Sequence, residues 1–224
     1  MKNYLIESNK KIKKSFLDSK LKFYVKDPVE YDLDLQDLQD VLLEKVPQVF
    51  LSLIDYIMFG EFDHLKNNDF NAAYMDGIIY VSNTQLNNKD IDDDIVHEIA
   101  HAIEENFYQH VYGDDIIENE FVIKRKVLAS RLKGEGYDIE GYNFTDPQFN
   151  PELDFFFYEE VGYPILATIT SDLFYSPYAA TAMREYFANG FEAYYFHRDY
   201  GRLGSVSPNL FYKIDNLEDQ IKSS

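Results

Sequence analysis

The segment that most constrains this chain is His97-Glu98-Ile99-Ala100-His101, which lies among apolar residues at helical spacing. Those apolar residues are Ile95, Ile99, Ala102, Ile103 and Phe107. Residues four positions apart lie one turn above each other on the same face of a helix. We therefore expect His97 and His101 to offer two imidazole nitrogens to one metal ion, with Glu98 within reach of a water bound there. This spacing is typical of zinc-dependent peptide hydrolysis. The alternative is two surface histidines on an ordinary helix.

A catalytic zinc ion usually has three protein ligands and an open position for water. The longer pattern H-E-x-x-H-x-x-G-x-x-H, which would supply a third histidine, is absent from this sequence. We therefore expect a carboxylate from a later helix, predicted over residues 179–197. Glu185 lies beside the apolar stripe of that segment, and Glu192 is the fallback. Asn189, one turn after Glu185, is placed to hydrogen-bond a ligating histidine.

Two motifs together resemble the gluzincin pattern of the anthrax lethal factor protease domain and its relatives, which include the secreted Pro-Pro endopeptidases. They are His97-Glu98-Ile99-Ala100-His101 and Glu185-Tyr186-Phe187-Ala188-Asn189-Gly190-Phe191. The second motif of that family is E-[FY]-F-A-x-x-F, with a tyrosine seven residues before the glutamate, and Tyr178 holds that place here. The resemblance covers roughly residues 35–197.

This resemblance implies an α+β, zincin-like metallopeptidase domain with a small mixed sheet, an active-site helix and a C-terminal helical subdomain. It implies one catalytic zinc ion, held by His97, His101 and Glu185. It also implies that Glu98 is the general base and that Tyr178 stabilises the transition state. The expected activity is that of a zinc endopeptidase acting on a peptide or protein substrate. Ala100 departs from the pattern, because several members of the family have glycine there.

The order of elements predicts a peripheral N-terminal arm over residues 1–32 and a single domain over 33–224. The stretch between the two motifs is longer than the resemblance leads us to expect, so we predict an insertion at about 112–165. Apolar spacing predicts a helix over 34–53, kinked or restarted at Pro47, and a second helix over 116–133. Strands are expected at 22–25 and 54–59.

Residues 72–82 are expected to form a hairpin with its turn at Asp76-Gly77. The second half of this hairpin directly precedes the metal-binding motif. It is a candidate edge strand to which an extended substrate could add by backbone hydrogen bonds, and a plain core hairpin is the alternative. The residues of this candidate strand are Ile78, Ile79, Tyr80 and Val81.

The net charge of −19 argues against nucleic acid or an anionic membrane as a main partner. The absence of cysteine excludes disulfides, thiolate metal sites and a cysteine nucleophile. No apolar run is long enough to span a bilayer, and the first residues lack the pattern of a secretory signal. We therefore expect a cytoplasmic or non-classically exported protein. The lysine-rich start of the chain is expected to be solvated.

Two other functions compete with a zinc endopeptidase of the gluzincin type. Regulatory proteases that cut phage repressors also carry H-E-x-A-H, although their second glutamate usually follows sooner. A non-catalytic, zinc-stabilised or metal-free binding module is the alternative from a different class, and the intact set of five expected site residues argues against it.

The acidic run 90–94 does not fit an EF-hand, because Ile95 and His101 hold the places of its glycine and glutamate. The remaining histidines, His64, His110 and His197, are expected at the surface or at helix ends.

Overall fold

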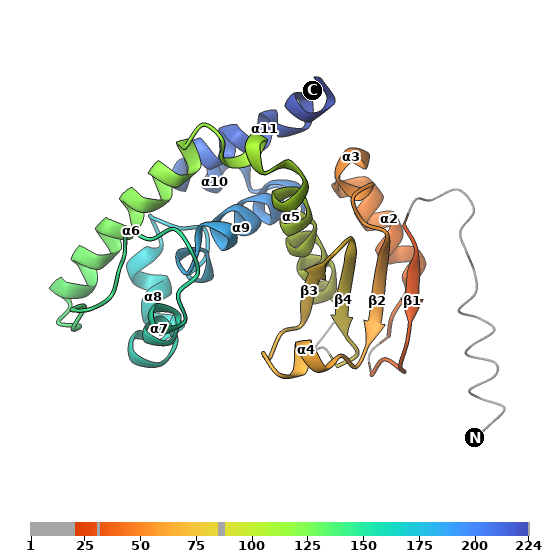
Figure 1. Ribbon diagram of the computed structural model, residues 1–224, viewed down its shortest axis with the longest axis horizontal. Helices are drawn as coiled ribbons and strands as arrows, with labels where there is room; N and C mark the ends of the chain where they lie inside the picture. Colours follow the sequence, from red (N-terminus) through yellow and green to blue (C-terminus); the bar gives the residue numbers. More distant parts are fainter. Residues whose placement is uncertain (1–20, 31, 85–87, 224) are drawn as a thin grey trace. The chain divides into compact units, whose positions relative to one another are not determined.

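The described chain is a mixed α+β protein (Figure 1), which confirms the predicted class at this level. The computed structural model describes residues 21–30, 32–84 and 88–223. The chain divides between Ala102 and Ile103 into two compact units. We call them the N-terminal unit and the C-terminal unit. This division differs from the single domain predicted over 33–224: the first unit gathers around a sheet, whereas the helices of the second pack on one another.

The N-terminal unit contains a four-stranded mixed sheet in the order β1-β2-β4-β3. Its strands are β1 (Phe23–Val25), β2 (Tyr56–Gly60), β3 (Ala72–Met75) and β4 (Ile78–Ser82). β2 runs parallel to both β1 and β4, whereas β3 is antiparallel to β4. The hairpin between β3 and β4 turns at Asp76-Gly77, as predicted. Both residues have positive φ, 49° and 81°, which the favoured two-residue hairpin turn requires.

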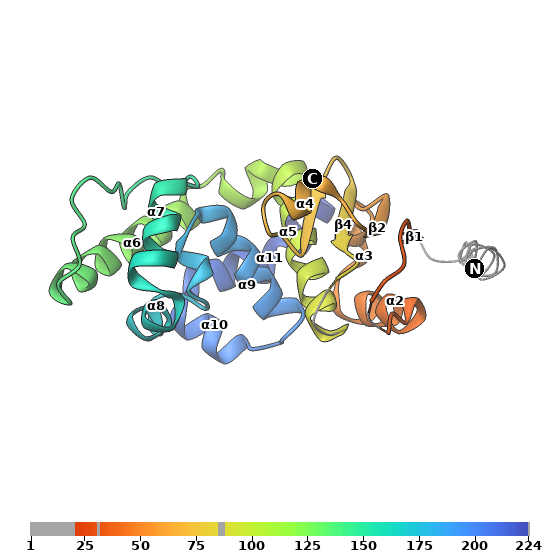
Figure 2. The same ribbon diagram turned by 90° about the horizontal axis from the view of Figure 1, so that it is seen from below.

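One face of this sheet is buried by helices. Ile57 pairs with Ile79, and Phe59 pairs with Val81, so these residues point to the same face, and all have 0% of their surface exposed. α2 and the first part of α5 lie on that face (Figure 2). The helices of this unit are α2 (Leu35–Lys45), α3 (Gln48–Leu51), α4 (Asp63–Lys66) and the start of α5 (Asn88–Tyr112). Pro47 directly precedes α3, which confirms that a second helix restarts there.

The C-terminal unit is helical in its described residues. Its elements after α5 are α6 (Ile116–Gly134), α7 (Pro151–Phe155), the π-helix η1 (Phe156–Val161), α8 (Tyr163–Thr170), the 3-10 helix η2 (Tyr178–Ala180), α9 (Met183–Tyr195), α10 (Tyr200–Val206) and α11 (Pro208–Ser223). α6 contacts α8, α9 and α11, and α9 also contacts α10 and α11. Helix α6 ends at Gly134, one residue beyond the predicted 116–133. Gly136 has a φ of 94°, and the N–H of Tyr137 donates to the carbonyl of Leu132.

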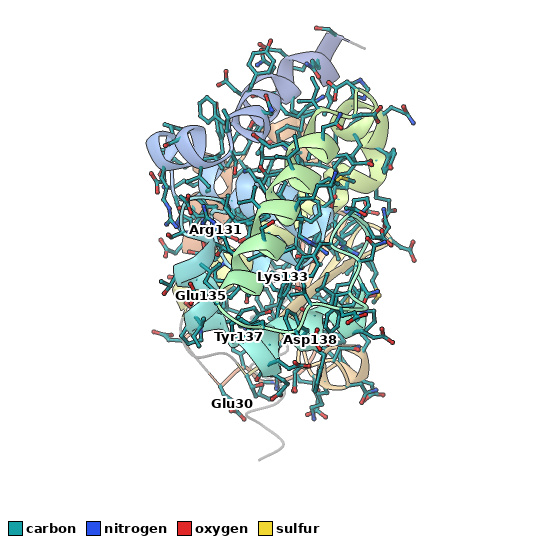
Figure 3. All side chains as sticks on the ribbon, turned by 90° about the vertical axis from the view of Figure 1, so that its left-hand side faces the viewer. Glu30, Arg131, Lys133, Glu135, Tyr137 and Asp138 are labelled. Carbon is teal, nitrogen blue, oxygen red and sulfur yellow. The ribbon has the colours of Figure 1, made fainter. Side chains whose placement is uncertain are left out.

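Arg131 connects the C-terminal half of α6 to α8, which lies alongside it in both ribbon views (Figures 1 and 2). Its guanidinium donates to the carbonyl of Ile169 at 2.6 Å and forms two hydrogen bonds, of 2.5 and 2.8 Å, with the carboxylate of Asp172. Lys133 and Glu135, labelled with Arg131 in Figure 3, are exposed at the same end of the helix. The fork of two parallel bonds fixes the side chain more firmly than a single contact would.

A buried polar network joins α6 to α9 and α11. The Glu120 carboxylate accepts hydrogen bonds from the Tyr186 hydroxyl at 2.7 Å and from the backbone N–H groups of Asn209 and Leu210 at 3.1 and 3.0 Å. The Lys124 ammonium donates to Tyr186 at 2.6 Å and to the Ser207 hydroxyl at 2.7 Å. Glu120 therefore satisfies two N–H groups in the first turn of α11, which the helix itself leaves without acceptors.

Two predicted boundaries are wrong in detail. β1 belongs to the sheet, so the arm predicted as peripheral over 1–32 contributes a strand, while residues 1–20 lie outside the described residues. The helix predicted over 179–197 begins only at Met183. Tyr178–Ala180 is a separate 3-10 turn, and Ala182 between them is extended, with φ −151° and ψ 158°. The N–H of Met183 bonds to the carbonyl of Pro147, which fixes this start from outside the helix.

Candidate metal and catalytic residues

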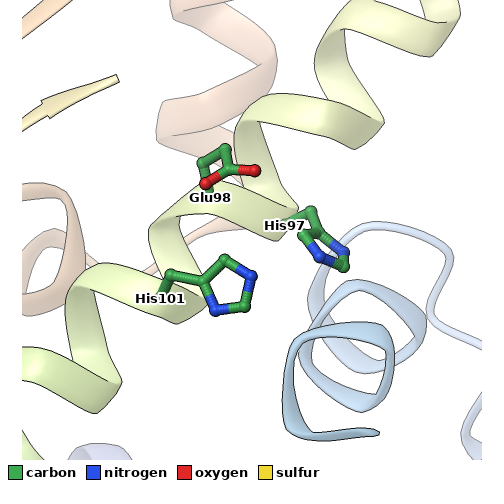
Figure 4. Close-up of side chains that lie close together, drawn as sticks. All are labelled: His97, Glu98 and His101. Carbon is green, nitrogen blue, oxygen red and sulfur yellow. The ribbon is translucent and has the colours of Figure 1, made fainter. Parts of the chain in front are cut away.

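His97, Glu98 and His101 lie together on helix α5 (Figure 4). Each of the three side chains places a potential ligand atom within 4.8 Å of the others. The two imidazole rings have their centroids 5.0 Å apart and are inclined at 80°. His101 is buried at 7% exposure, whereas His97 and Glu98 are half-buried. The structure thus confirms the predicted convergence of these three side chains.

The apolar residues around the motif explain how this part of the helix is packed. Ile95, Val96, Ile99 and Ala100 each have 0% of their surface exposed, so this part of α5 is anchored on two adjoining sides. Burial of that stripe sets the rotation of the helix about its axis. The histidines at the remaining positions therefore share one side of it.

Glu98 is connected to the sheet by a hydrogen bond. The backbone N–H of Tyr74 in β3 donates to Oε2 of Glu98 at 2.7 Å. Backbone groups alternate in direction along a strand, and the carbonyl of Asn71 bonds to Ser82 at the end of β4. Ala72 and Tyr74 therefore turn their backbone N–H and C=O groups away from β4. The carboxylate predicted to be the general base lies beside the outer backbone of β3.

The predicted edge strand is wrong. Ile78, Ile79, Tyr80 and Val81 belong to β4, which lies between β2 and β3 and has its backbone paired on both sides. The edge of the described sheet on this side is β3. Both halves of the hairpin have apolar residues, so composition does not distinguish the outer from the inner strand. Parallel pairing with β2 decides the order of the strands, and the β2 partner of each β4 residue lies 22 positions earlier in the chain.

The donor set on α5 fits a zinc ion. Imidazole nitrogen and carboxylate oxygen are both ordinary zinc ligands. Two histidines one turn apart can bind one ion after small side-chain rotations, since their ligand atoms are already within 4.8 Å of each other. A carboxylate next to them is available for hydrogen bonding to a bound water.

Glu185 and Asn189 lie on α9 in the C-terminal unit, and both are buried, at 7% and 6% exposure. Oε1 of Glu185 lies 3.4 Å from Nε of Arg184. Nδ2 of Asn189 donates to the carbonyl of Glu185 at 3.0 Å, and its Oδ1 accepts a short hydrogen bond from the Ser176 hydroxyl. Asn189 thus connects α9 to the segment before Tyr178. Its predicted bond to a ligating histidine stays a prediction.

Tyr178 lies on the 3-10 helix η2 with 38% of its surface exposed. Burial, followed by the charge of Glu185, raises the pKa of Tyr178 well above the ordinary value for tyrosine. The hydroxyl, already protonated at neutral pH in an ordinary tyrosine, remains a hydrogen-bond donor there. The charge of Asp154 also contributes to this shift, and one carboxylate oxygen of Asp154 is buried without a hydrogen-bond partner among the described residues.

Burial, followed by the charge of Asp154, raises the pKa of Tyr163 to about 12. Burial and the charge of Glu185 also raise the pKa of Asp154. Neither Tyr163 nor Asp154 is among the site residues predicted from the sequence. Their spacing follows no known motif, so no sequence signal singled them out.

The other candidate residues have structural partners. Oε1 of Glu192, the fallback ligand, lies 3.1 Å from Nε2 of His197 and accepts a hydrogen bond from it in the tautomer that carries the proton on Nε2. The ring of His64 packs against Phe62 and Tyr80, with centroids 5.7 and 4.8 Å away. His64 is half-buried and lies in the short helix α4, which agrees with the predicted helix-end position.

Comparisons with protein-family models, with curated proteins and with solved structures found no match to this chain. Within the described residues, no helix combines the length and the apolar character that crossing a lipid bilayer requires.

Proposed function

We propose that this chain is a zinc-dependent endopeptidase with a zincin-like catalytic domain. One observation carries the proposal: His97, Glu98 and His101 bring their ligand atoms within 4.8 Å of one another on one helix, and Glu98 is hydrogen-bonded to the outer backbone of the edge strand β3. Two histidines and a carboxylate at this spacing, beside a strand with outward-facing backbone groups, suit hydrolysis of an extended peptide.

In this proposal His97, His101 and Glu185 hold the metal. Glu185 is assigned from the sequence motif and from its burial on α9, with Glu192 less suitable because it is already paired with His197. A bound zinc ion supplies Lewis acidity, which polarises the scissile carbonyl and makes a coordinated water more acidic. Asn189 holds the backbone of Glu185 through its amide and so orients the start of α9.

Glu98 acts as the general base. Its carboxylate takes a proton from the attacking water and delivers it to the leaving amine. The hydrogen bond from Tyr74 holds the carboxylate at the side of β3, where a substrate adding as a further strand would place its scissile bond. Tyr178, whose hydroxyl stays protonated, donates a hydrogen bond to the developing oxyanion.

The test is cleavage of a peptide library by the purified wild-type chain and by Glu98→Gln, with the zinc content of each measured. We expect wild type to cleave and to lose activity on chelation. Glu98→Gln should retain about as much zinc but lose turnover, because an amide cannot accept the water proton. Glu105→Gln is the matched control: it makes the same change at an exposed position on the same helix and should leave both quantities unchanged.

Two outcomes would contradict the proposal. Near-normal cleavage by Glu98→Gln would remove Glu98 as the base. Stoichiometric zinc without cleavage of any peptide would favour a zinc-stabilised binding module instead. Cleavage restricted to one repressor-like protein would keep the peptidase chemistry and favour the regulatory protease as its biological form.

A further inference from the structure

Arg125 is a completely buried arginine on helix α6, with 0% of its surface exposed. Its Nη1 donates one hydrogen bond to the carbonyl of Ala180 at 2.9 Å and another to the carbonyl of Thr181 at 3.1 Å. These carbonyls end the short segment that contains Tyr178 and leads into α9. We call residues 177–182 the tyrosine turn.

The tyrosine turn has little side-chain mass to hold it in place. Ala179, Ala180 and Ala182 are each 0% exposed, so half of the segment's residues are buried with only a methyl group for packing. The last carbonyls of a helical turn receive no hydrogen bond from an N–H within the turn, so their donor must come from outside it. Arg125 satisfies two of them in succession, and its long side chain reaches them from a neighbouring helix.

The guanidinium is enclosed by aromatic rings. Its central carbon lies 5.2 Å from the ring centroid of Phe121, 5.7 Å from that of Phe144 and 5.9 Å from that of Phe157. Such contacts stabilise a cation and fix its plane. Nε and Nη2 have no hydrogen-bond partner among the described residues, so both directed bonds of this side chain go to the tyrosine turn.

Packing alone does not account for an arginine here. Burying a charge without a paired carboxylate is costly, and an apolar side chain of similar size would fill the same space. Burial lowers the pKa of Arg125 to about 10, which leaves it charged at neutral pH. The cost is offset by the rings and the two carbonyls that the side chain contacts, and by the charge of Asp146, which favours the charged guanidinium.

We propose that Arg125 is a positioning residue that holds the tyrosine turn, and through it Tyr178 and the start of α9, in the arrangement that catalysis needs. The inference rests on the proposed peptidase function. Arg125 itself contacts no reacting atom. Its effect on the reaction passes through the hydroxyl of Tyr178.

The experiment is a double-mutant cycle between Arg125→Met and Tyr178→Phe, with Arg125→Lys and Phe144→Leu alongside. Arg125→Met should lower kcat by about 10–100-fold, with zinc content unchanged and KM within about threefold. Adding Arg125→Met to Tyr178→Phe should lower kcat at most about twofold below that of Tyr178→Phe alone, because without the Tyr178 hydroxyl there is no oxyanion hydrogen bond left for Arg125 to position. Arg125→Lys keeps a charge and one donor group and should recover part of kcat.

Phe144→Leu is the matched control, since it loosens the same cavity while leaving both carbonyl bonds in place. It should lower the thermal midpoint but not kcat. The inference would be overturned if the fold losses of kcat in Arg125→Met and Tyr178→Phe multiply in the double variant. It would also be overturned if Phe144→Leu lowers kcat as much as Arg125→Met does.

Hydrogen exchange separates this inference from the proposed function. Amides of residues 179–183 should exchange faster in Arg125→Met and Arg125→Lys than in Phe144→Leu, whether or not the protein cleaves peptides. If wild type cleaves no peptide, the proposed peptidase function fails. Faster exchange confined to these amides would still show that Arg125 stabilises the tyrosine turn. Unchanged exchange of these amides would show that Arg125 does not stabilise the turn.

Discussion

At the scale of single residues, Tyr178 is the clearest test of the proposed chemistry. Burial and the charge of Glu185 raise its pKa further above neutral, so its hydroxyl is protonated at neutral pH, like that of an ordinary tyrosine, and can donate a hydrogen bond. Tyr178→Phe removes one oxygen and nothing else. We expect kcat to fall by about 10²–10³, the usual cost of one oxyanion donor, with zinc content unchanged. A steady-state assay with metal analysis checks this. An unimpaired kcat would exclude Tyr178 from the mechanism.

Asp92, in the first part of α5, gives a pH-dependent prediction. Burial, with a smaller contribution from the charge of Asp37, raises the pKa of Asp92 from 3.8 to about 6 in the folded state. A raised carboxyl pKa means that the folded state favours the protonated form. Its stabilising contribution is present below about pH 4 and is lost as the pH rises through about 6.

We therefore expect Asp92→Asn to stabilise the protein at pH 7 and to have little effect at pH 4. Two pKa units correspond to about 2.7 kcal/mol, and partial exposure of the side chain reduces this to about 1 kcal/mol. Thermal unfolding at both pH values measures the difference. Asp37→Asn should give a smaller gain with the same pH dependence. A gain from Asp92→Asn that is equal at pH 4 and pH 7 would contradict the assignment.

The sequence predicted residues whose role depends on local spacing and missed those whose role depends on distant contacts. His97, Glu98 and His101 lie within five positions on one helix, so helical geometry alone brings them together. Arg125 bonds to carbonyls 55 and 56 residues further along the chain. One signal for it existed: Arg125 occupies a position of the apolar stripe that includes Phe121, Leu128 and Leu132, where a charge is unexpected.

At the scale of elements, Glu120 attaches α11 to α6. Replacing it with alanine leaves the Tyr186 hydroxyl and two N–H groups of α11 without their acceptor, and it removes the carboxylate nearest the buried Lys124. We expect Glu120→Ala to lower the free energy of unfolding by about 3 kcal/mol. Chemical denaturation measures this, with exposed Glu135→Ala as a control that should change it by less than about 0.5 kcal/mol. Equal effects of the two substitutions would show that the network does not stabilise the fold.

Helices, strands and turns were predicted correctly where the residues that determine them lie within the element itself. The hairpin turn at Asp76-Gly77 and the restart of a helix after Pro47 follow from the backbone preferences of those residues. Two features depend on partners elsewhere. β4 is an inner strand because it pairs with β2, and α9 begins at Met183 because its N–H bonds to Pro147. Neither partner is marked in the local sequence, so the edge strand and the helix start were both misplaced.

At the scale of the whole molecule, the proposed zinc ligands are divided between the two units, with His97 and His101 in one and Glu185 in the other. A ligand that binds only the folded protein raises its thermal midpoint in proportion to RT ln(1 + [L]/Kd). If all three residues bind one ion, zinc must stabilise both units, since each supplies a ligand. Calorimetry of the chelated protein, followed by titration with zinc, measures this.

We expect zinc to raise every unfolding transition of the wild-type chain, and chelation to reverse the effect. In Glu185→Ala zinc should still bind the two histidines, but more weakly, so it should raise only the transition of the N-terminal unit. Glu192→Ala is the matched control on the same helix and should respond to zinc as wild type does. A zinc response that is the same in Glu185→Ala and wild type would exclude Glu185 as a ligand, while loss of the response in Glu192→Ala alone would assign that role to Glu192.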